Sequence, residues 1–559
     1  MIDKECVVEI PKGARIYKRL YVYINTDSKY DPQLKYTKSK RKCIGKLIDD
    51  KTMHPNDFYK QQLTQAAQDV LPEAPSQSDS LSVGLTAVLN KIARNIGLKR
   101  SLRSIFEPKI ADFILDLAMY NIATESGAFQ HYAAFAFSNA LFSKKVLSDS
   151  TISRFFQKKV YSNEIYCFLK EWFKQNDGKS DETTYLCYDS TNINSMAKDI
   201  DVAQKGYAKD DPSKPQVNLE YIVRQRDGLP LFYKSYPGSI VDVTECKDMI
   251  KNITALGYHN AMVICDRGYA FNIIMQTFDE AGIDFLMMLR AEENTKDVIK
   301  IYGPSIKLCS ERYIESHNVY GDTFELNIDG TSKTRYVHIV WDQEKAYHRH
   351  EEIMQKVSNA CESLTRIQAE NKAISNTEYN KLSKYYNITL EPETRKILSF
   401  EIKSKEIDEK VELSGYYVMV SSIKLTCEQA VEAYTKRDCV EKTFRALKSN
   451  LGLEALRNHS DDAIDGKLFV LFIASILRSS LFNSTKTLRL KDRKNFTIPA
   501  IIKELNKIIV IRNSIVDKYV RKYELTAKQK NILSQFSINE KKMDEFIRTL
   551  NSSYKKMKS

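Results

Sequence analysis

The chain has few of the residues that build metal or redox sites from soft ligands. Its 559 residues include 10 cysteines and 8 histidines, and the cysteines form no C-x-x-C pair and no grouping with histidine. This spacing excludes the usual zinc-binding patterns and gives no disulfide framework. Because scattered, unpaired cysteines are typical of a reducing compartment, we expect the protein in a cytoplasm.

Long apolar runs are also missing. The densest one, Leu468–Leu477, is about half as long as a membrane span and is flanked by Lys467 and Arg478, so we expect a buried helix there. The first ten residues, MIDKECVVEI, lack the basic and then apolar order of a secretory signal. We therefore expect no membrane partner and no secretion.

Positive charge is present in excess, and it is concentrated toward the two ends. Lys and Arg total 85 against 72 Asp and Glu, which gives a net charge of +13. Residues 484–559 hold 19 basic and 7 acidic residues, and residues 12–46 hold 11 and 2. Basic ends around an acidic centre suit a protein that holds a polyanion outside and does chemistry inside. For either end alone, a merely solvated lysine-rich surface is the alternative.

The chain is too long for one ordinary core, and its patterns divide it into regions. Alternating residues at 15–48 predict a basic β-hairpin, and the polar stretch 50–80 has the character of a linker. A mixed α/β sheet follows, with early antiparallel strands and later crossover units. The expected regions are a basic β-hairpin region (1–60), a helical region (61–180), an α/β core in two parts (181–294 and 413–482), an insertion between them (295–412) and a basic helical C-terminal region (483–559).

Three carboxylates are the candidates for chemistry. Asp189 and Asp266 each close a strand-like run, and Glu441 lies on a helix predicted over 426–452. Acids at strand ends and on an adjacent helix can meet at one sheet edge. Clustered carboxylates without His or Cys select Mg²⁺ or Mn²⁺, and two such ions can drive phosphoryl displacement. Any one acid alone could instead be a cap or turn residue.

The helix predicted over 426–452 places four polar residues on one stripe. Tyr434, Arg437, Glu441 and Lys448 fall within about 60° of arc when each residue turns the helix by about 100°. A capping-box pattern opens this segment and a glycine closes it. A surface salt bridge would explain the spacing of Arg437 and Glu441 equally well.

These motifs together resemble a known family, the DDE transposases of bacterial insertion sequences, in the insertion-sequence 4 superfamily. The family signature, Y-x2-R-x3-E-x6-K, is matched at all four positions by the stripe. Its first acidic motif, a strand ending D-[ST]-T, is matched at 188–191, and its second, D-R-G-[YF], at 266–269. The segment GLPLFYKSYPGSIVDVT at 228–244 is similar to the family's G-x-P hairpin with its downstream acidic motif.

The resemblance implies both a fold and an activity. The fold is a ribonuclease-H-like α/β core with a mixed sheet, interrupted by a β-rich insertion. The activity is metal-dependent DNA cleavage and strand transfer at the terminal inverted repeats of an insertion sequence, using two Mg²⁺ or Mn²⁺ ions. The implied partners are double-stranded DNA, both repeats and target, and a second copy of the chain in a DNA-bound homodimer. The implied setting is a bacterial cytoplasm, with nucleoid association when DNA is bound.

The resemblance also implies roles for individual residues. Asp189, Asp266 and Glu441 would bind the metal ions and act as the catalytic acids. The residues that would contact DNA phosphates near the cleaved end are Tyr434, Arg437, Lys448, Arg267 and Arg445.

Several alternatives remain open. In related transposases a Trp of the insertion stacks on a flipped base, but Trp341 ends an apolar strand pattern, so we favour a core position for it. His348 and His350 suggest a metal ligand pair less well than a solvated helix face. The alternative function is a sequence-specific DNA-binding protein derived from a transposase and no longer catalytic. The intact acid triad argues against that alternative, because clustered acids repel phosphate.

Overall fold

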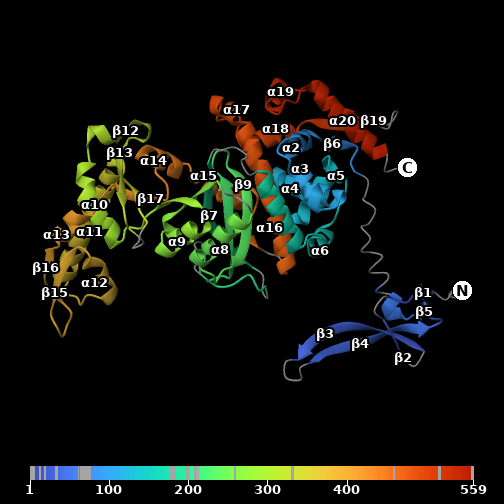
Figure 1. The fold of residues 1–559 in the computed structure, drawn as a ribbon, viewed down its shortest axis with the longest axis horizontal. Helices are drawn as coiled ribbons and strands as arrows, with labels where there is room; N and C mark the ends of the chain where they lie inside the picture. The colour runs from blue at the N-terminus through green and yellow to red at the C-terminus, as the bar shows by residue number, and fades with distance from the viewer. Residues whose placement is uncertain are drawn as a thin grey trace. The chain divides into compact units, whose positions relative to one another are not determined.

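The chain forms two compact units, Met1–Ser76 and Gln77–Ser559, in a computed structural model, and each unit is described by itself. Figure 1 shows the elements of both units. The structure describes residues 7–11, 14–17, 20–31, 36–60, 62, 77–176, 183–196, 200–206, 211, 213–256, 260–328, 333–456, 460–513 and 518–555.

The N-terminal unit is a five-stranded antiparallel sheet in the order β1-β5-β4-β3-β2. The predicted hairpin is confirmed, because its two long strands, β3 and β4, pair with each other. The linker predicted over 50–80 is wrong in its first part, where β5 pairs with β4; residues 63–76 lie outside the described residues. The strands are β1 (Val8–Glu9), β2 (Arg15–Tyr17), β3 (Tyr21–Asp31), β4 (Tyr36–Leu47) and β5 (Thr52–Pro55).

The second unit begins with a short strand, β6 (Ser80–Ser82), and a layer of helices that pack around one buried helix, α16 (Asp461–Ser484). The buried helix predicted at Leu468–Leu477 is confirmed, since every residue of that run is buried. In the described part of the chain, no helix is both long and apolar enough to cross a membrane. The surrounding helices are α2 (Gly84–Asn95), α3 (Leu98–Ile105), α4 (Pro108–Thr124), α5 (Tyr132–Ser138), α6 (Asp149–Lys159) and α7 (Ser162–Gln175).

The centre of the second unit is a mixed sheet, as predicted. Its first three strands, β7 to β9, are antiparallel neighbours. The next two, β10 and β11, run parallel to β7 and to each other. Helix α8 (Asp242–Ala255) connects β9 to β10, and helix α9 (Asn272–Ala281) connects β10 to β11. The strand order is therefore β9-β8-β7-β10-β11. The strands are β7 (Thr184–Ser195), β8 (Gln216–Arg224), β9 (Leu229–Pro237), β10 (Ala261–Cys265) and β11 (Asp284–Met288).

The insertion continues this sheet and adds a separate lobe. Beyond β11, antiparallel strands extend the sheet in the order β17, β14, β13, β12. The lobe has its own apolar core, built on the long helix α11. The elements are α10 (Glu293–Tyr302), β12 (Tyr313–Ile314), β13 (Val319–Leu326), β14 (Arg335–Trp341), α11 (Gln343–Ala369), α12 (Asn376–Leu382), β15 (Tyr386–Leu390), β16 (Ile397–Ile402), α13 (Ser404–Glu412) and β17 (Tyr416–Ser421).

Two side chains of the insertion follow the simpler interpretation. Trp341 is buried at the end of β14, and its indole Nε1 donates a hydrogen bond of 3.1 Å to the carbonyl oxygen of Ser414. The core position favoured for it is therefore confirmed. His348 and His350 are exposed on α11, as expected for a solvated helix face.

The C-terminal region contains strands as well as the expected helices. Strand β19 pairs with β20 and with β6, which lies more than four hundred residues earlier in the chain. The ends of the second unit are thus joined in one small sheet. The elements are α17 (Lys486–Lys491), α18 (Ile498–Asn506), β19 (Ile509–Asn513), β20 (Lys518–Arg521), α19 (Ala527–Ser534) and α20 (Glu540–Lys555).

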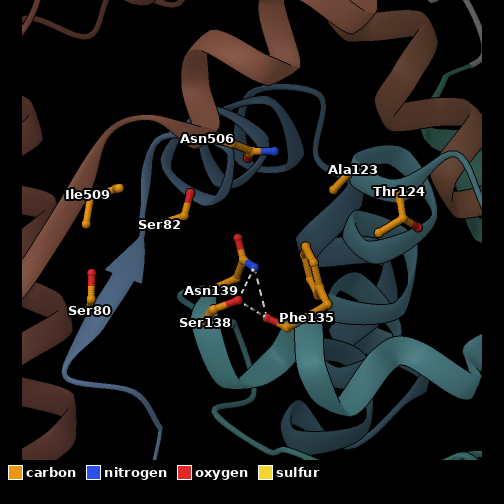
Figure 2. Close-up of a pocket in the computed structure, with 9 residues that line it drawn as sticks. All are labelled: Ser80, Ser82, Ala123, Thr124, Phe135, Ser138, Asn139, Asn506 and Ile509. Carbon is orange, nitrogen blue, oxygen red and sulfur yellow. Dashed lines mark hydrogen bonds between the residues drawn. The ribbon is translucent and has the colours of Figure 1, made fainter.

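A cavity of about 450 Å³ lies where β6 and β19 meet the helices (Figure 2). Asn139 lies at its wall, where its side-chain Nδ2 donates a hydrogen bond of 2.8 Å to the carbonyl oxygen of Phe135. None of the side chains that line this cavity is charged, so the predicted acid chemistry has no place in it. They are Ser80, Ser82, Ala123, Thr124, Phe135, Ser138, Asn139, Asn506 and Ile509.

We predict that Gly466→Ala destabilises the protein, although alanine is the better helix former by about 1 kcal/mol. A Cβ at Gly466 would lie 2.7 Å from the Cβ of Phe156, inside the packed contact between α16 and α6. Overpacking of this kind costs about 1–3 kcal/mol, so the net effect is a loss. Urea unfolding measures it. The control, Thr365→Ala on the exposed side of α11, should be neutral or slightly stabilising; a gain of stability in Gly466→Ala contradicts the packing argument.

Candidate active site

The three predicted acids lie around a single guanidinium group, that of Arg437. Arg437 Nη1 is 3.3 Å from Asp189 Oδ2, and Nη2 is 2.5 Å from Glu441 Oε1 and 3.8 Å from Asp266 Oδ1. The Arg437 side chain is largely buried, with 8% of the residue exposed. The fold therefore brings together three acids from distant parts of the sequence, and it places a cation between them.

The first two acids are held by neighbouring parallel strands. Cys187 on β7 is opposite Ile264 on β10, and each acid stands two residues further along its chain. As predicted, Asp266 directly follows strand β10. A short 3-10 helix, Arg267–Tyr269, begins at the next residue. Asp189 does not close its strand, because β7 continues to Ser195 while pairing with β8. The local pattern missed this because a strand's length depends on its partner.

The segment 426–452 is not one helix, which corrects the sequence prediction. Helix α14 (Cys427–Thr435) ends before Lys436, and helix α15 (Asp438–Arg445) begins after Arg437. At the break, the Arg437 N–H donates to the carbonyl oxygen three residues back, that of Tyr434, at 3.0 Å. A π-helical turn, Ala446–Asn450, then follows. Interruptions of this kind are frequent at functional sites.

Both predicted ends of this segment are confirmed. Thr426 and Gln429 form a capping box, with each side chain accepting a hydrogen bond from the other residue's backbone N–H. Gly452 has a φ of 71°, the left-handed conformation expected of a helix C-terminal cap. A Cβ there would lie 2.1 Å from the backbone nitrogen of Gly127, so the glycine also permits a close backbone contact.

Tyr434 and Arg437 make their contacts with acids. The Tyr434 hydroxyl donates a hydrogen bond of 3.0 Å to Asp266 Oδ1, and its ring centre is 5.5 Å from the guanidinium carbon of Arg437. Burial, and then the charge of Asp266, raise the pKa of Tyr434. Burial opposes the charged form of Arg437, but the tyrosine and the acids outweigh it, so the pKa of Arg437 is raised. Tyr434 therefore stays neutral and Arg437 stays charged.

The other three predicted DNA contacts lie at less buried positions. Lys448 is half-buried on the π-helical turn, while Arg445 is exposed at the end of α15. Arg267 is exposed on the 3-10 helix directly after Asp266. Arg267 and Arg445 are thus close to the acids in the sequence, and both residues are exposed to solvent.

Sequence reasoning missed two residues that hold the second acidic motif in place. Arg290 donates from Nε to the carbonyl oxygen of Arg267 at 3.1 Å and from Nη2 to that of Gly268 at 2.7 Å. The Tyr269 hydroxyl donates a hydrogen bond to Ser190 Oγ at 2.9 Å, which links the two aspartate motifs. The sequence does contain a signal for Arg290, because this arginine directly follows the strand-like run DFLMML. No sequence signal indicates that Ser190 accepts a hydrogen bond from Tyr269.

As carboxylates, the three acids are suitable ligands for a metal ion, but their arrangement is not that of a metal-binding cluster. Within the described residues, no group of three or more His, Cys, Asp or Glu side chains is placed to hold a metal ion. Hard cations such as Mg²⁺ prefer several carboxylate oxygens. Here oxygens of three carboxylates lie 2.5 to 3.8 Å from one cation, the guanidinium of Arg437.

Comparison with known proteins now identifies the family. A family model described as the transposase DDE domain matches residues 181–477, more than half of the chain. The chain is a member of the DDE transposase family. All three acids and Arg437 lie within the matched range. A search of curated proteins finds no match to this transposase.

Among solved structures, the transposase is similar to one described as a piggyBac transposase synaptic complex with hairpin DNA, studied by cryo-electron microscopy. The two chains share 11% identity, the match covers 76% of each chain, and the TM-score is 0.36.

We predict that Arg437→Gln binds Mn²⁺ more tightly than the wild type when DNA is absent. The guanidinium competes with a metal for the same carboxylates, and its own Nε is buried with no hydrogen-bond partner among the described residues. We expect a gain on the order of tenfold, or about 1.4 kcal/mol, measured by calorimetric titration. The control is Lys436→Gln, an adjacent exposed cation that pairs with Glu432. Equal affinities in all three proteins would contradict competition.

Glu220 is fully buried on β8, opposite Ser190 in the register with β7, and accepts a hydrogen bond of 2.8 Å from the Tyr188 hydroxyl. Burial raises the pKa of Glu220 from 4.5 to about 8. The folded protein therefore holds a proton that the unfolded chain releases, and this contribution to stability is lost as pH rises from about 4.5 to about 8.

We expect Glu220→Gln to flatten this pH dependence, because glutamine keeps the shape and does not titrate. Urea unfolding at several pH values within that window measures it. Glu325→Gln, at an exposed position on β13, is the control and should leave the wild-type slope unchanged. An equally steep loss of stability in Glu220→Gln would show that other groups cause it.

Proposed function

We propose that this protein is the transposase of a bacterial insertion sequence, in the insertion-sequence 4 superfamily, that cleaves DNA at terminal inverted repeats and joins the ends to target DNA. The observation that supports it most is the convergence of Asp189, Asp266 and Glu441 on one cation. The family membership supplies the DNA chemistry. The match of Tyr434, Arg437, Glu441 and Lys448 to the Y-x2-R-x3-E-x6-K signature supports the superfamily assignment.

The proposed core is ribonuclease-H-like. Its support is the strand order β9-β8-β7-β10-β11, with an antiparallel meander followed by two parallel strands reached through helices. In this core the first acid lies on the central strand β7 and the second follows its parallel neighbour β10. Elements far apart in the sequence then supply one site. The insertion lies between β11 and β17, and because these two strands pair with each other, it does not interrupt the sheet.

The three acids would hold two Mg²⁺ or Mn²⁺ ions. When bound, such ions supply a Lewis acid and an activated hydroxyl for in-line displacement at phosphorus. Arg437 would then leave the carboxylates for a DNA phosphate, since a guanidinium binds phosphate in the same two-pronged way. Tyr434 keeps its proton and can donate it in a hydrogen bond to the same phosphate.

The remaining assignments follow from the family's mode of action. Lys448, Arg267 and Arg445 would contact phosphates on either side of the cut, from positions after Asp266 and Glu441. The helical region 61–180 would bind the DNA ends, and two copies of the chain would act together on them. A bacterial cytoplasm, with binding to the nucleoid through DNA, is the proposed setting.

We predict that Glu441→Gln abolishes strand transfer by the purified protein on its cognate ends with Mg²⁺. Loss of an outer-shell partner of a metal ligand costs up to about 100-fold, and loss of a ligand should exceed that. Activity is read from joined products on a sequencing gel. The cognate ends come from sequencing the DNA that flanks the gene, where inverted repeats between short direct duplications mark a mobile element.

The control is Glu432→Gln on α14, an exposed acid that pairs with Lys436 and should leave strand transfer unchanged. Wild-type activity in Glu441→Gln refutes the proposed mechanism. Tight end binding by the wild type, without nicking in Mg²⁺ or Mn²⁺, would instead identify a non-catalytic DNA-binding protein.

A further inference from the structure

The N-terminal unit is a body with a core of its own. Val22, Ile44 and Met53 are fully buried together, with Phe58 and Tyr59 packed against them. These residues come from β3, β4, β5 and the segment after β5, so the core joins the strands at one end of the hairpin. Among the residues whose side chains the structure describes, this core lies at one end of the hairpin, with Ile24 packed against it.

Beyond that core the hairpin is a two-stranded ribbon, Ile24–Asp31 paired with Tyr36–Lys42. Strand β2 pairs with β3 only over Tyr21–Tyr23, and β5 pairs with β4 only over Gly45–Leu47. Among the described residues, the ribbon's two edges therefore have no further strand. An isolated two-stranded ribbon is at best marginally stable in water, and its edges are open to a partner.

The ribbon's sequence is strongly basic on one strand. Strand β4 carries five basic residues and no acid, and Arg41 and Lys42 at the base of the ribbon are exposed. In the register, Lys29 is paired with Lys38, so basic residues stand on both strands of the ribbon. The basic residues of β4 are Lys38, Lys40, Arg41, Lys42 and Lys46.

We propose that this ribbon is a second DNA-binding element, which lies in the major groove of duplex DNA. Its Ile24–Asp31 strand is about 24 Å long at about 3.4 Å per residue. The major groove, about 12 Å wide, admits a two-stranded ribbon. The deep, narrow major groove of an RNA duplex does not, which favours DNA. The inference rests on the proposed function for its partner, and adds a site that the acid chemistry does not need.

The test is salt-dependent binding of the full-length protein to a mixed-sequence DNA duplex. Each lost phosphate contact lowers the slope of log affinity against log salt by about 0.9. A variant with Lys38, Lys40 and Arg41 all changed to threonine, which keeps strand propensity, should lower the slope by about 2 to 3. Its affinity at moderate salt should fall at least tenfold. Methylation of guanine N7, which faces the major groove, should weaken wild-type binding.

Two controls distinguish the effect of positive charge on the ribbon from the effect of the protein's total positive charge. Lys38→Arg with Lys40→Arg keeps the charge and should keep the wild-type slope. Lys356, Lys372 and Lys384 are exposed lysines of the insertion lobe, and their joint change to glutamine should leave the slope near that of the wild type. The inference is overturned if the threonine variant keeps the wild-type slope, if the lobe variant loses as much, or if an RNA duplex shows the same losses.

Failure of this inference is distinguishable from failure of the proposed function. Metal-dependent nicking of cognate ends at saturating protein measures the activity that depends on the three acids. The variant with Lys38, Lys40 and Arg41 changed to threonine should retain this activity. If the DNA is nicked and the threonine variant keeps the wild-type salt slope, DNA binding by the ribbon is refuted and the proposed catalysis is not. A changed slope without nicking in any protein supports the ribbon as a DNA-binding element and refutes the proposed catalysis.

Discussion

One buried guanidinium surrounded by three carboxylates sets the conditions for the rest of the catalytic core. Carboxylates brought this close repel one another, and the repulsion grows as burial lowers the effective dielectric constant. Arg437 offsets that repulsion, yet one positive charge cannot balance three negative ones. Arg437 therefore neutralises the cluster only in part, and the Tyr434 hydroxyl adds a hydrogen bond to Asp266.

Holding such a site requires rigid elements on every side of it. Strands β7 and β10 fix two acids by their register, and the Tyr269–Ser190 hydrogen bond ties the loop after β10 back to β7. The third acid sits on α15, which packs against β7 and β8. Helix α16, buried along its length, then supports the β9 side of the sheet and carries the helical layer.

Local sequence signals predicted the main elements and named Asp189, Asp266 and Glu441, which the fold brings into one cluster. Contacts between distant parts of the chain set the details. The capping box at Thr426 and the left-handed Gly452 depend on neighbours within a few residues, so spacing alone predicts them. The break at Arg437 was not predictable, because the helical periodicity of the sequence continues through it. At this break Arg437 contacts Asp189 and Asp266, which lie far away in the sequence. The length of β7 beyond Asp189 likewise depends on β8, and β19 forms because β6 offers an edge.

The pairing of β6 with β19 has a consequence for how the protein is made. The two strands are separated by about 430 residues, and a ribosome adds about 5–20 residues per second, so β6 emerges roughly 20 to 90 seconds before its partner. During that time an edge strand next to a helical layer is exposed. A message cut short before β19 would yield a chain with most of its catalytic core and this edge permanently open. Until β19 has been made, the edge of β6 that pairs with it stays open to other strands.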